Sequence, residues 1–287
     1  MVLAIVLAAI FAPLIAPYDP ILQHRGVDQA LAPPGGPFLL GTDQLGRDVL
    51  SRLIYGARTS LTVGLAANLL ATGFGTLVGA VAGFVGDPRV RIGRRLRFRL
   101  PVETLLMRFT DVLLALPALL LAIALAAVVG QSLGVVVTVI AALLWTTTAR
   151  IVYGRVLDLK RREFIEAAIA LGASPPRILV RHVLPHVAPL VVVYATLGIA
   201  ATVLFEATLS YLGAGVPPPT PSWGSMISEG TPYYQVDPLL VLVPGMAIML
   251  TILAFNLLGD ALRDAMDPHA ARSPRRAHSG LAMTQGG

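Results

Sequence analysis

The sequence contains no cysteine, and only 13% of its 287 residues are charged. Without cysteine there can be no disulfide, no thiolate metal ligand and no cysteine nucleophile. A soluble globular protein carries about 25% charged residues, so a chain this poor in charge cannot cover a water-facing surface. The hydrophobic fraction of 55% also excludes a disordered chain. The composition therefore indicates a protein that lies in a membrane.

Long runs without charged residues indicate where the chain crosses the membrane. A bilayer core about 30 Å thick requires about 20 apolar residues in a helix. Residues 112–149 are too many for one crossing, and turn-forming residues at 130–134 divide them into two helices. The runs lack the apolar–polar alternation of a membrane β-barrel. Six transmembrane helices are predicted, at 1–17, 61–86, on either side of 130–134, and at 187–211 and 238–259.

The positive charges predict the orientation of the helices, because Lys and Arg concentrate in cytoplasmic loops. With a cytoplasmic N-terminus, 18 of the 22 Lys and Arg fall on the inner side, in 87–111, in 150–186 and from 260 onward. Both termini are therefore predicted to be cytoplasmic. In these loops the positive charges fix the topology and contact anionic lipid headgroups. They therefore do not indicate nucleic-acid binding.

The chain is predicted to have four parts. Residues 1–17 are interpreted as a first transmembrane helix with a truncated start; a cleaved signal peptide is the alternative, but its positively charged beginning is missing. Residues 18–60 form an external segment, either a solvated loop or one in which Thr42 or Asp43 caps a short surface helix. Residues 61–262 form the five-helix core, and residues 263–287 are a cytoplasmic tail that we expect to be disordered.

One inner loop is rich in arginine, with six arginines between 88 and 102 and a seventh at Arg108. Such a loop can contact lipid headgroups or a cytoplasmic partner. The sequence alone leaves both alternatives open.

A second inner loop, 150–186, carries signals for two short helices. Residues 163–171 have good helix propensity, and Gly172 suits a left-handed C-terminal cap. Ser174 can cap the next helix and Pro175 fits its first turn. Pro185 is predicted to end that helix or to kink it into the next span. Lipid anchoring does not require two capped helices, so this segment is interpreted as a docking element on the cytoplasmic side.

The residues of this loop resemble a known motif. Glu166-Ala167-Ala168, followed by Gly172 and then by Leu184-Pro185, resembles the EAA loop of bacterial ABC importer permeases. His182, where the broader pattern has isoleucine, is similar to the dipeptide, oligopeptide and nickel subfamily. Three further stretches resemble its C-type permease subunit, at 39–48, 111–117 and 206–224.

The resemblance implies an all-α polytopic membrane protein with six transmembrane helices and the type I ABC importer permease fold. It implies a homologous second permease subunit, two ATPase subunits and an external substrate-binding protein as partners, in a bacterial plasma (inner) membrane. This chain lacks a phosphate-binding loop, so no cofactor is expected on it; ATP and Mg would bind the partner subunits. The residues implied in ATPase coupling, within helices at 163–185, are Glu166, Ala167, Ala168, Gly172, Ala173, His182, Leu184 and Pro185.

The function implied is ATP-driven import of di- or oligopeptides, with nickel, glutathione or another small solute as the alternative. A secondary transporter that needs no ATPase is the rival of a different class, but it leaves the 163–185 motif unexplained. No enzymatic motif and no metal site is found in the spans. Polar residues within a span are costly and often functional. The candidates for the translocation pathway are Glu206, Asn68 and Asn256.

Overall fold

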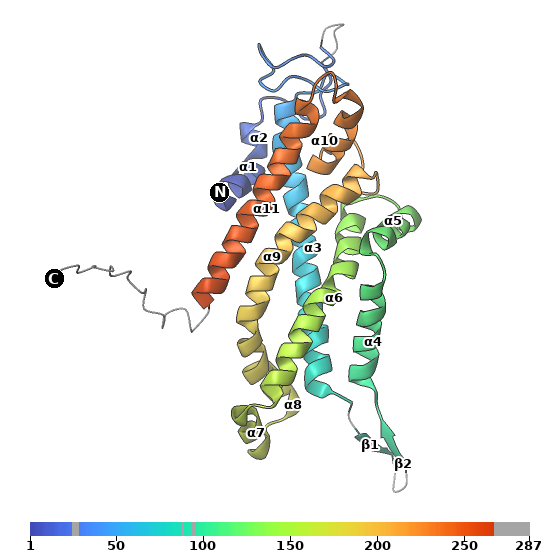
Figure 1. Cartoon of the computed structure of the whole chain (residues 1–287), viewed down its shortest axis with the longest axis vertical. Coiled ribbons are helices and arrows are strands. Elements are labelled where there is room, and N and C mark those ends of the chain that lie inside the picture. The colour runs from blue at the N-terminus through green and yellow to red at the C-terminus, as the bar shows by residue number, and fades with distance from the viewer. Residues whose placement is uncertain (25–28, 88, 93–95, 267–287) are drawn as a thin grey trace, which may run out of the picture.

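The computed structural model describes residues 1–24, 29–87, 89–92 and 96–266, and shows an elongated bundle of helices with two distinct ends (Figure 1). Residues 18–24 and 29–48 and the short helix α10, Trp223–Gly230, lie at one end, here called the outer end. The helices α7, Glu163–Ala170, and α8, Pro175–Ile178, lie at the opposite, inner end. Residues 267–287, most of the tail predicted to be disordered, are outside the described residues.

Four described helices are long and apolar enough to cross a membrane. They are α3, Val49–Val85; α6, Leu133–Lys160; α9, Leu184–Tyr211, which continues from α8; and α11, Leu239–Met266. A fifth crossing consists of α4, Val102–Ala115, and α5, Ala118–Val129, which meet at a bend of 92°. The single helix predicted before 130–134 is therefore wrong. Pro117 stands at this break, where it caps α5, and a proline inside a helix cannot supply the required N–H.

The predicted helix at 1–17 is also interrupted. The structure has α1, Val2–Ile10, and α2, Ala12–Ile15, with a break at Phe11. Pro13 lies in the first turn of α2, the position where a missing backbone N–H costs no hydrogen bond. The nine residues of α1 span about 13 Å at 1.5 Å per residue, which is less than the bilayer core.

Close packing of α3 against α6 forms the centre of the bundle. Gly75, Gly79 and Gly83 recur every fourth residue and so lie on one face of α3. A Cβ atom at Gly75 or Gly79 would overlap a backbone carbonyl oxygen of α6, at Trp145 and Ala149 respectively. The spacing of these glycines is the small-residue pattern that lets membrane helices approach closely. This signal was present in the sequence but was not used in the prediction.

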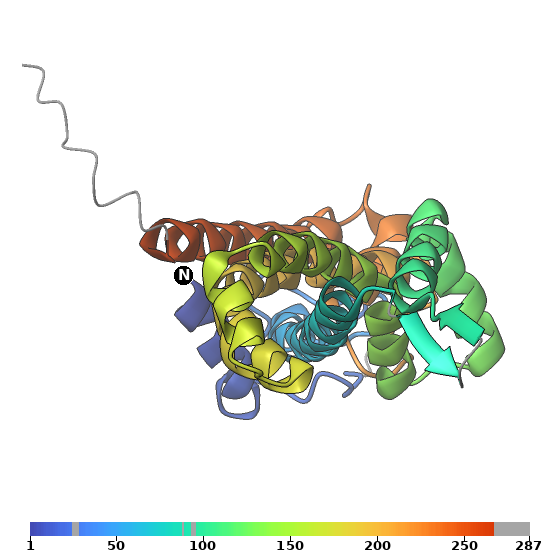
Figure 2. The same cartoon turned by 90° about the horizontal axis from the view of Figure 1, so that it is seen from below.

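The inner end carries a two-stranded antiparallel hairpin in addition to its helices. Its strands are β1, Arg89–Ile92, and β2, Leu96–Arg99, paired from Arg89 with Arg99 to Ile92 with Leu96. Figure 2 shows the hairpin and the helices α7 and α8 on opposite sides of this end. The arginine-rich stretch therefore contains strand structure that the helical prediction missed.

The last part of the outer segment, residues 41–48, is mostly buried rather than a solvated loop, whereas residues 33–37 are exposed. The true cap of α3 is Asp48, whose carboxylate accepts from the backbone N–H of Ser51 at 2.8 Å, so neither Thr42 nor Asp43 caps a surface helix. Both Thr42 and Asp43 are buried, as is Arg52, which is only 2% exposed. The predicted external segment thus ends at 48, and the first 12 residues of α3 belong to the buried bundle.

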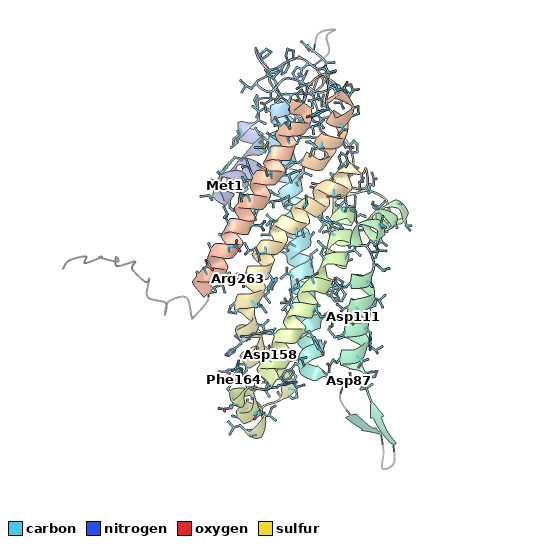
Figure 3. The ribbon with its side chains drawn as sticks, viewed as in Figure 1. Met1, Asp87, Asp111, Asp158, Phe164 and Arg263 are labelled. Atoms are coloured by element: carbon cyan, nitrogen blue, oxygen red, sulfur yellow. The ribbon has the colours of Figure 1, made fainter. Side chains whose placement is uncertain are left out.

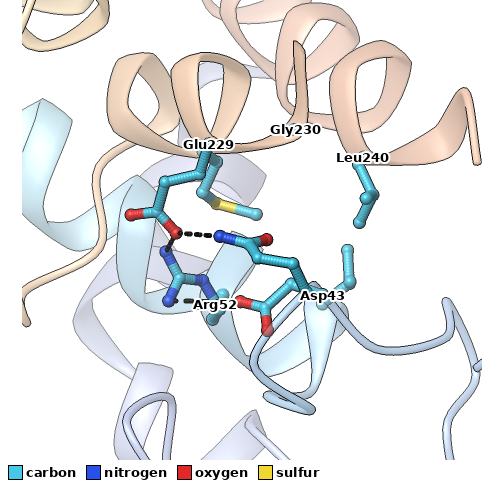
Figure 4. Close-up of a pocket in the computed structure, with 8 residues that line it drawn as sticks. Asp43, Arg52, Glu229, Gly230 and Leu240 are labelled. Atoms are coloured by element: carbon cyan, nitrogen blue, oxygen red, sulfur yellow. Dashed lines mark hydrogen bonds and ion pairs between the residues drawn. The ribbon is translucent and has the colours of Figure 1, made fainter. Parts of the chain in front are cut away.

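Four charged side chains hold this outer segment to the rest of the fold, and Figure 4 shows three of them, Asp43, Arg52 and Glu229. Asp43 pairs with Arg47 at 2.7 Å and with Arg52 at 3.4 Å. Glu229, at the end of α10, pairs with Arg52 at 2.9 Å and also with Arg47. Two arginines and two carboxylates thus balance their charges where water is largely excluded. We call Asp43, Arg47, Arg52 and Glu229 the outer ion network.

Candidate coupling elbow and membrane groove

Residues 163–185 form a compact elbow at the inner end of the bundle. The chain passes through α7 and reverses at Gly172. It then continues through α8 and a π-helical turn, η1 (Leu179–Val183), into α9. Figure 3 places Phe164, in the first turn of α7, at the same end as Asp87, which follows α3. We call residues 163–185 the coupling elbow.

The reversal at Gly172 is a complete Schellman motif. Gly172 has a φ of +79°, which residues with a Cβ atom rarely adopt. Its backbone N–H donates to the carbonyl of Ile169 at 2.9 Å, and the N–H of Ala173 donates to the carbonyl of Ala168 at 3.1 Å. Ala168 and Ala173 are half-buried against one apolar cluster, which supplies the hydrophobic contact that accompanies this motif. The predicted left-handed cap is confirmed.

Buried aliphatic side chains anchor the elbow to the bundle. Ile165 of α7 is 0% exposed and Ile178 of α8 is 1% exposed. Together with Val183 they pack in one cluster with Phe84 of α3 and Val156 of α6. Each arm of the elbow therefore has its own apolar attachment to the inner ends of two spanning helices. A force applied to the elbow is transmitted to those helices because all of these contacts are close-packed.

Two details of the predicted elbow differ in the structure. Ser174 occupies the N-cap position of α8, but its side chain makes no capping hydrogen bond. Pro185 neither ends nor sharply kinks the helix: it lies in the first turn of α9, directly after the π-turn. A π-turn displaces the backbone hydrogen-bond pattern by one residue, which accommodates the proline without a break.

The outward surface of the elbow is unusually apolar. Glu166 and Ala167 of the EAA motif are exposed, and so is Gly172. Leu171, next to the reversal, is 88% exposed, and Ile169 is 54% exposed. The tip of the elbow therefore combines exposed large apolar side chains with the exposed residues of the motif.

The remaining predicted coupling residues form the return arm of the elbow. His182 is half-buried in the π-turn, and its carbonyl oxygen lies 2.6 Å from Nδ1 of His186. The His186 ring stacks on Phe164 at 4.9 Å, which ties the start of α7 to the start of α9. Leu184 packs against the apolar anchor, whereas Pro185 is exposed. The structure therefore brings the predicted coupling residues together in one element.

A groove of about 270 Å³ lies between α3, α6 and α9, and because half of its lining residues are polar we call it the polar groove. Asn68 is 4% exposed and donates to the carbonyl of Ala195 at 2.7 Å, which joins α3 to α9. The groove is lined by Asn68 together with the polar residues Thr72, Thr147, Thr148, Tyr194 and Thr202. Asn68 was predicted as a pathway residue, whereas the threonines of the groove were not, because a threonine does not interrupt a hydropathy run.

The other two pathway candidates lie elsewhere. Glu206 is 0% exposed and accepts a hydrogen bond from Ser210 at 2.7 Å. It is fully buried and does not line the polar groove. Asn256 is half-buried on α11 and makes no side-chain hydrogen bond to any residue that the structure describes. Only Asn68 of the three candidates lines the polar groove.

Comparison with known proteins identifies the family. The model of the family described as binding-protein-dependent transport system inner membrane component matches residues 75–272. The model of the N-terminal transmembrane domain of oligopeptide transport permease C matches residues 1–34. The chain belongs to this family of transport permeases. As a permease it is a transport subunit and a multi-pass protein of the inner membrane.

Two curated relatives are similar over most of the permease. A di/tripeptide transport system permease protein, DppC, of Pseudomonas aeruginosa (strain UCBPP-PA14) is 42% identical over 93% of this chain and 85% of its own length. A glutathione transport system permease protein, GsiD, of Escherichia coli O6:K15:H31 is 40% identical over 93% of this chain and 84% of its own.

A solved structure supports the fold. The inward-facing MetNI methionine ABC transporter matches with a TM-score of 0.59 at 19% identity, over 75% of this permease and 95% of that chain. The permease therefore has the type I ABC importer permease fold, which confirms the fold class predicted from the sequence. The described residues contain four spanning helices and one bent pair, rather than the six spans predicted.

Proposed function

We propose that this permease imports short peptides and that ATP hydrolysis by partner subunits drives the import. The observation that carries the proposal is the coupling elbow: a capped reversal, anchored by Ile165 and Ile178, with an exposed apolar tip. The relatives named for di- and tripeptides and for glutathione support a peptide substrate. Glutathione is itself a tripeptide, so these two names share one chemistry; nickel or another small solute is the alternative.

The complex that we propose contains three other kinds of subunit. A homologous second permease would face the polar groove, so that substrate passes along the interface between the two chains. An external binding protein would deliver the peptide at the outer end. Two ATPase subunits, which bind ATP and Mg, would receive the coupling elbow in a groove on their surface. This arrangement places the coupling elbow and both termini in the cytoplasm.

Each coupling residue has a proposed role in this mechanism. Glu166 makes a polar contact with an ATPase subunit, and the small Ala167 and Ala168 allow that subunit to approach closely. Gly172 and Ala173 set the reversal, and His182, Leu184 and Pro185 transmit its movement into α9. When the ATPases close, the rigid elbow shifts with them and tilts the spans, which reverses access to the groove.

The test uses the complete complex in liposomes, with the partner permease, the ATPases and the binding protein. We expect vanadate-sensitive uptake of labelled dialanine, and peptide-stimulated ATP hydrolysis. Uptake that continues unchanged with vanadate would instead show a secondary transporter. A panel of di- and oligopeptides, glutathione and nickel then identifies the substrate class.

A matched pair of variants at Gly172 isolates the coupling step. A Cβ atom there meets nothing within 4 Å, so only the backbone conformation limits the substitution. Gly172→Val should lose most stimulated hydrolysis, because a β-branched residue strongly disfavours this φ. Gly172→Asn should retain it, because asparagine tolerates the left-handed region. Equal activity of the two variants would remove the role of the Gly172 reversal in coupling.

A further inference from the structure

A second cavity opens at the outer end of the permease, away from the coupling elbow. Its volume is about 480 Å³, and it lies between residues 19–21 of the outer segment, the first part of α3, Leu133 of α6, and Thr220 and Pro221 before α10. Cavities that hold small molecules measure about 300–1,000 Å³. The cavity is thus large enough for a short peptide.

One wall of this outer cavity is a polar face of α3. Tyr55, Arg58, Thr59 and Thr62 line it, and their spacing of three or four residues puts them on one side of the helix. Arg58 is exposed and makes no ion pair with any described residue. Arg52, two turns earlier on the same helix, is paired with Asp43 and Glu229. The guanidinium of Arg58 is therefore free to bind a carboxylate from outside the chain.

Asp19 contributes the opposite charge to the same cavity. Its Oδ1 atom accepts from the backbone N–H of Ile21 at 2.8 Å, which fixes the side chain at the start of the outer segment. The other oxygen, Oδ2, makes no hydrogen bond to a described residue. Asp19 and Arg58 line one cavity without forming an ion pair with each other. The cavity therefore presents a separated cation and anion.

We propose that this cavity binds a zwitterionic short peptide as it enters the permease, with the C-terminal carboxylate on Arg58 and the N-terminal ammonium on Asp19. Arginine forms two parallel hydrogen bonds with a carboxylate, which gives both affinity and orientation. Thr62 and Thr220 also line the cavity, and their hydroxyl groups would hydrogen-bond the peptide bond. The peptide class rests on the proposed function, whereas the site itself is tested without transport.

The absence of cysteine makes a direct binding experiment possible. Thr62→Cys places the only thiol of this chain on the cavity wall, and a membrane-impermeant maleimide then reports access to it in the assembled complex. Dialanine should slow labelling, whereas dialanine amide and N-acetyl-dialanine, each lacking one terminal charge, should protect much less. If Thr62→Cys prevents assembly, Thr220→Cys serves as the second reporter on the same cavity.

Variants of Arg58 and Asp19 then show which end of the peptide each residue binds. Arg58→Gln should weaken protection by dialanine about tenfold, the effect of losing one charge-assisted contact. Arg58→Lys should restore part of it, and Asp19→Asn should remove the preference for dialanine over its N-acetyl form. Arg155→Gln is the matched control, because Arg155 is an exposed arginine on α6 that does not line this cavity.

Three results would overturn the proposal: no protection by dialanine, equal protection by the blocked peptides, or protection that Arg58→Gln leaves unchanged. Labelling that follows the phosphatidylethanolamine content of the liposomes, and not the peptide, would assign the cavity to a lipid headgroup. Loss of dialanine uptake alone, with protection intact, would contradict the proposed function and leave this site standing.

Discussion

The two ends of this permease hold their loops by opposite means. At the outer end, two arginines and two carboxylates pair in a largely buried network that joins residues 43–52 to Glu229. At the inner end, Ile165, Ile178 and Val183 anchor the coupling elbow through apolar contacts, and the charged and small residues of its motif stay exposed. A network of paired, largely buried charges favours a single geometry, because any other arrangement would leave a charge without its partner. An apolar anchor with an exposed tip leaves a surface for a partner.

The largest effect is expected at the outer end. Glu229→Leu leaves Arg47 and Arg52 short of one counter-charge, at a cost of about 3 kcal/mol for a broken buried pair. The Tm of the purified permease should fall accordingly, measured by thermal unfolding in detergent. Asp158→Asn, at an exposed aspartate on α6, is the control and should leave the Tm unchanged. Similar Tm values for both variants would show that the ion network does not hold this end.

An effect of similar size is expected for the apolar anchor of the elbow. Ile165→Ala removes a side chain that is 0% exposed, a change that costs about 2–4 kcal/mol in a close-packed core. Because the contact lies at the inner end, the loss should detach α7 and reduce stimulated ATP hydrolysis while α3 and α6 remain packed. Limited proteolysis within 163–173 should become faster. Unchanged cleavage there would contradict the anchoring role.

The exposed tip should show no effect on stability but a clear effect on assembly. Leu171 is 88% exposed, so Leu171→Ser should change the free energy of unfolding by no more than about 0.5 kcal/mol and leave the Tm nearly unchanged. Binding of the ATPase subunits should weaken, measured by their co-purification. If Leu171→Ser lowered the Tm as Ile165→Ala does, the distinction between anchor and tip would be lost.

The smallest effect is expected for Glu206, a fully buried acid of α9. Glu206 has the Ser210 hydroxyl as a hydrogen-bond donor and no cationic partner among the described residues, unlike Glu229. Glu206→Gln keeps an oxygen that can accept the same hydrogen bond. Peptide uptake and the Tm should both stay near their original values. A large loss of uptake at a normal Tm would return Glu206 to the translocation pathway.

The elbow was predictable from the sequence because its geometry follows from neighbours. Gly172, Ala168 and Ala173 lie within six residues, and the Schellman motif needs only their backbone hydrogen bonds. The outer ion network was not predictable, because Arg52 and Glu229 are 177 residues apart and their charges look solvated in a loop rich in Pro and Gly. The polar groove was missed for the same reason: its threonines come from three helices.

By itself, the sequence determined the membrane location, most of the crossings and the capped reversal at Gly172, since hydropathy and helix capping act over a few turns of chain. Only the tertiary structure decided the bend between α4 and α5, the burial of Arg47 and Arg52, and which polar side chains share a cavity. The reason is physical: a charge or hydroxyl is buried only where distant segments supply its partner, and the pairing exists only once the helices have packed.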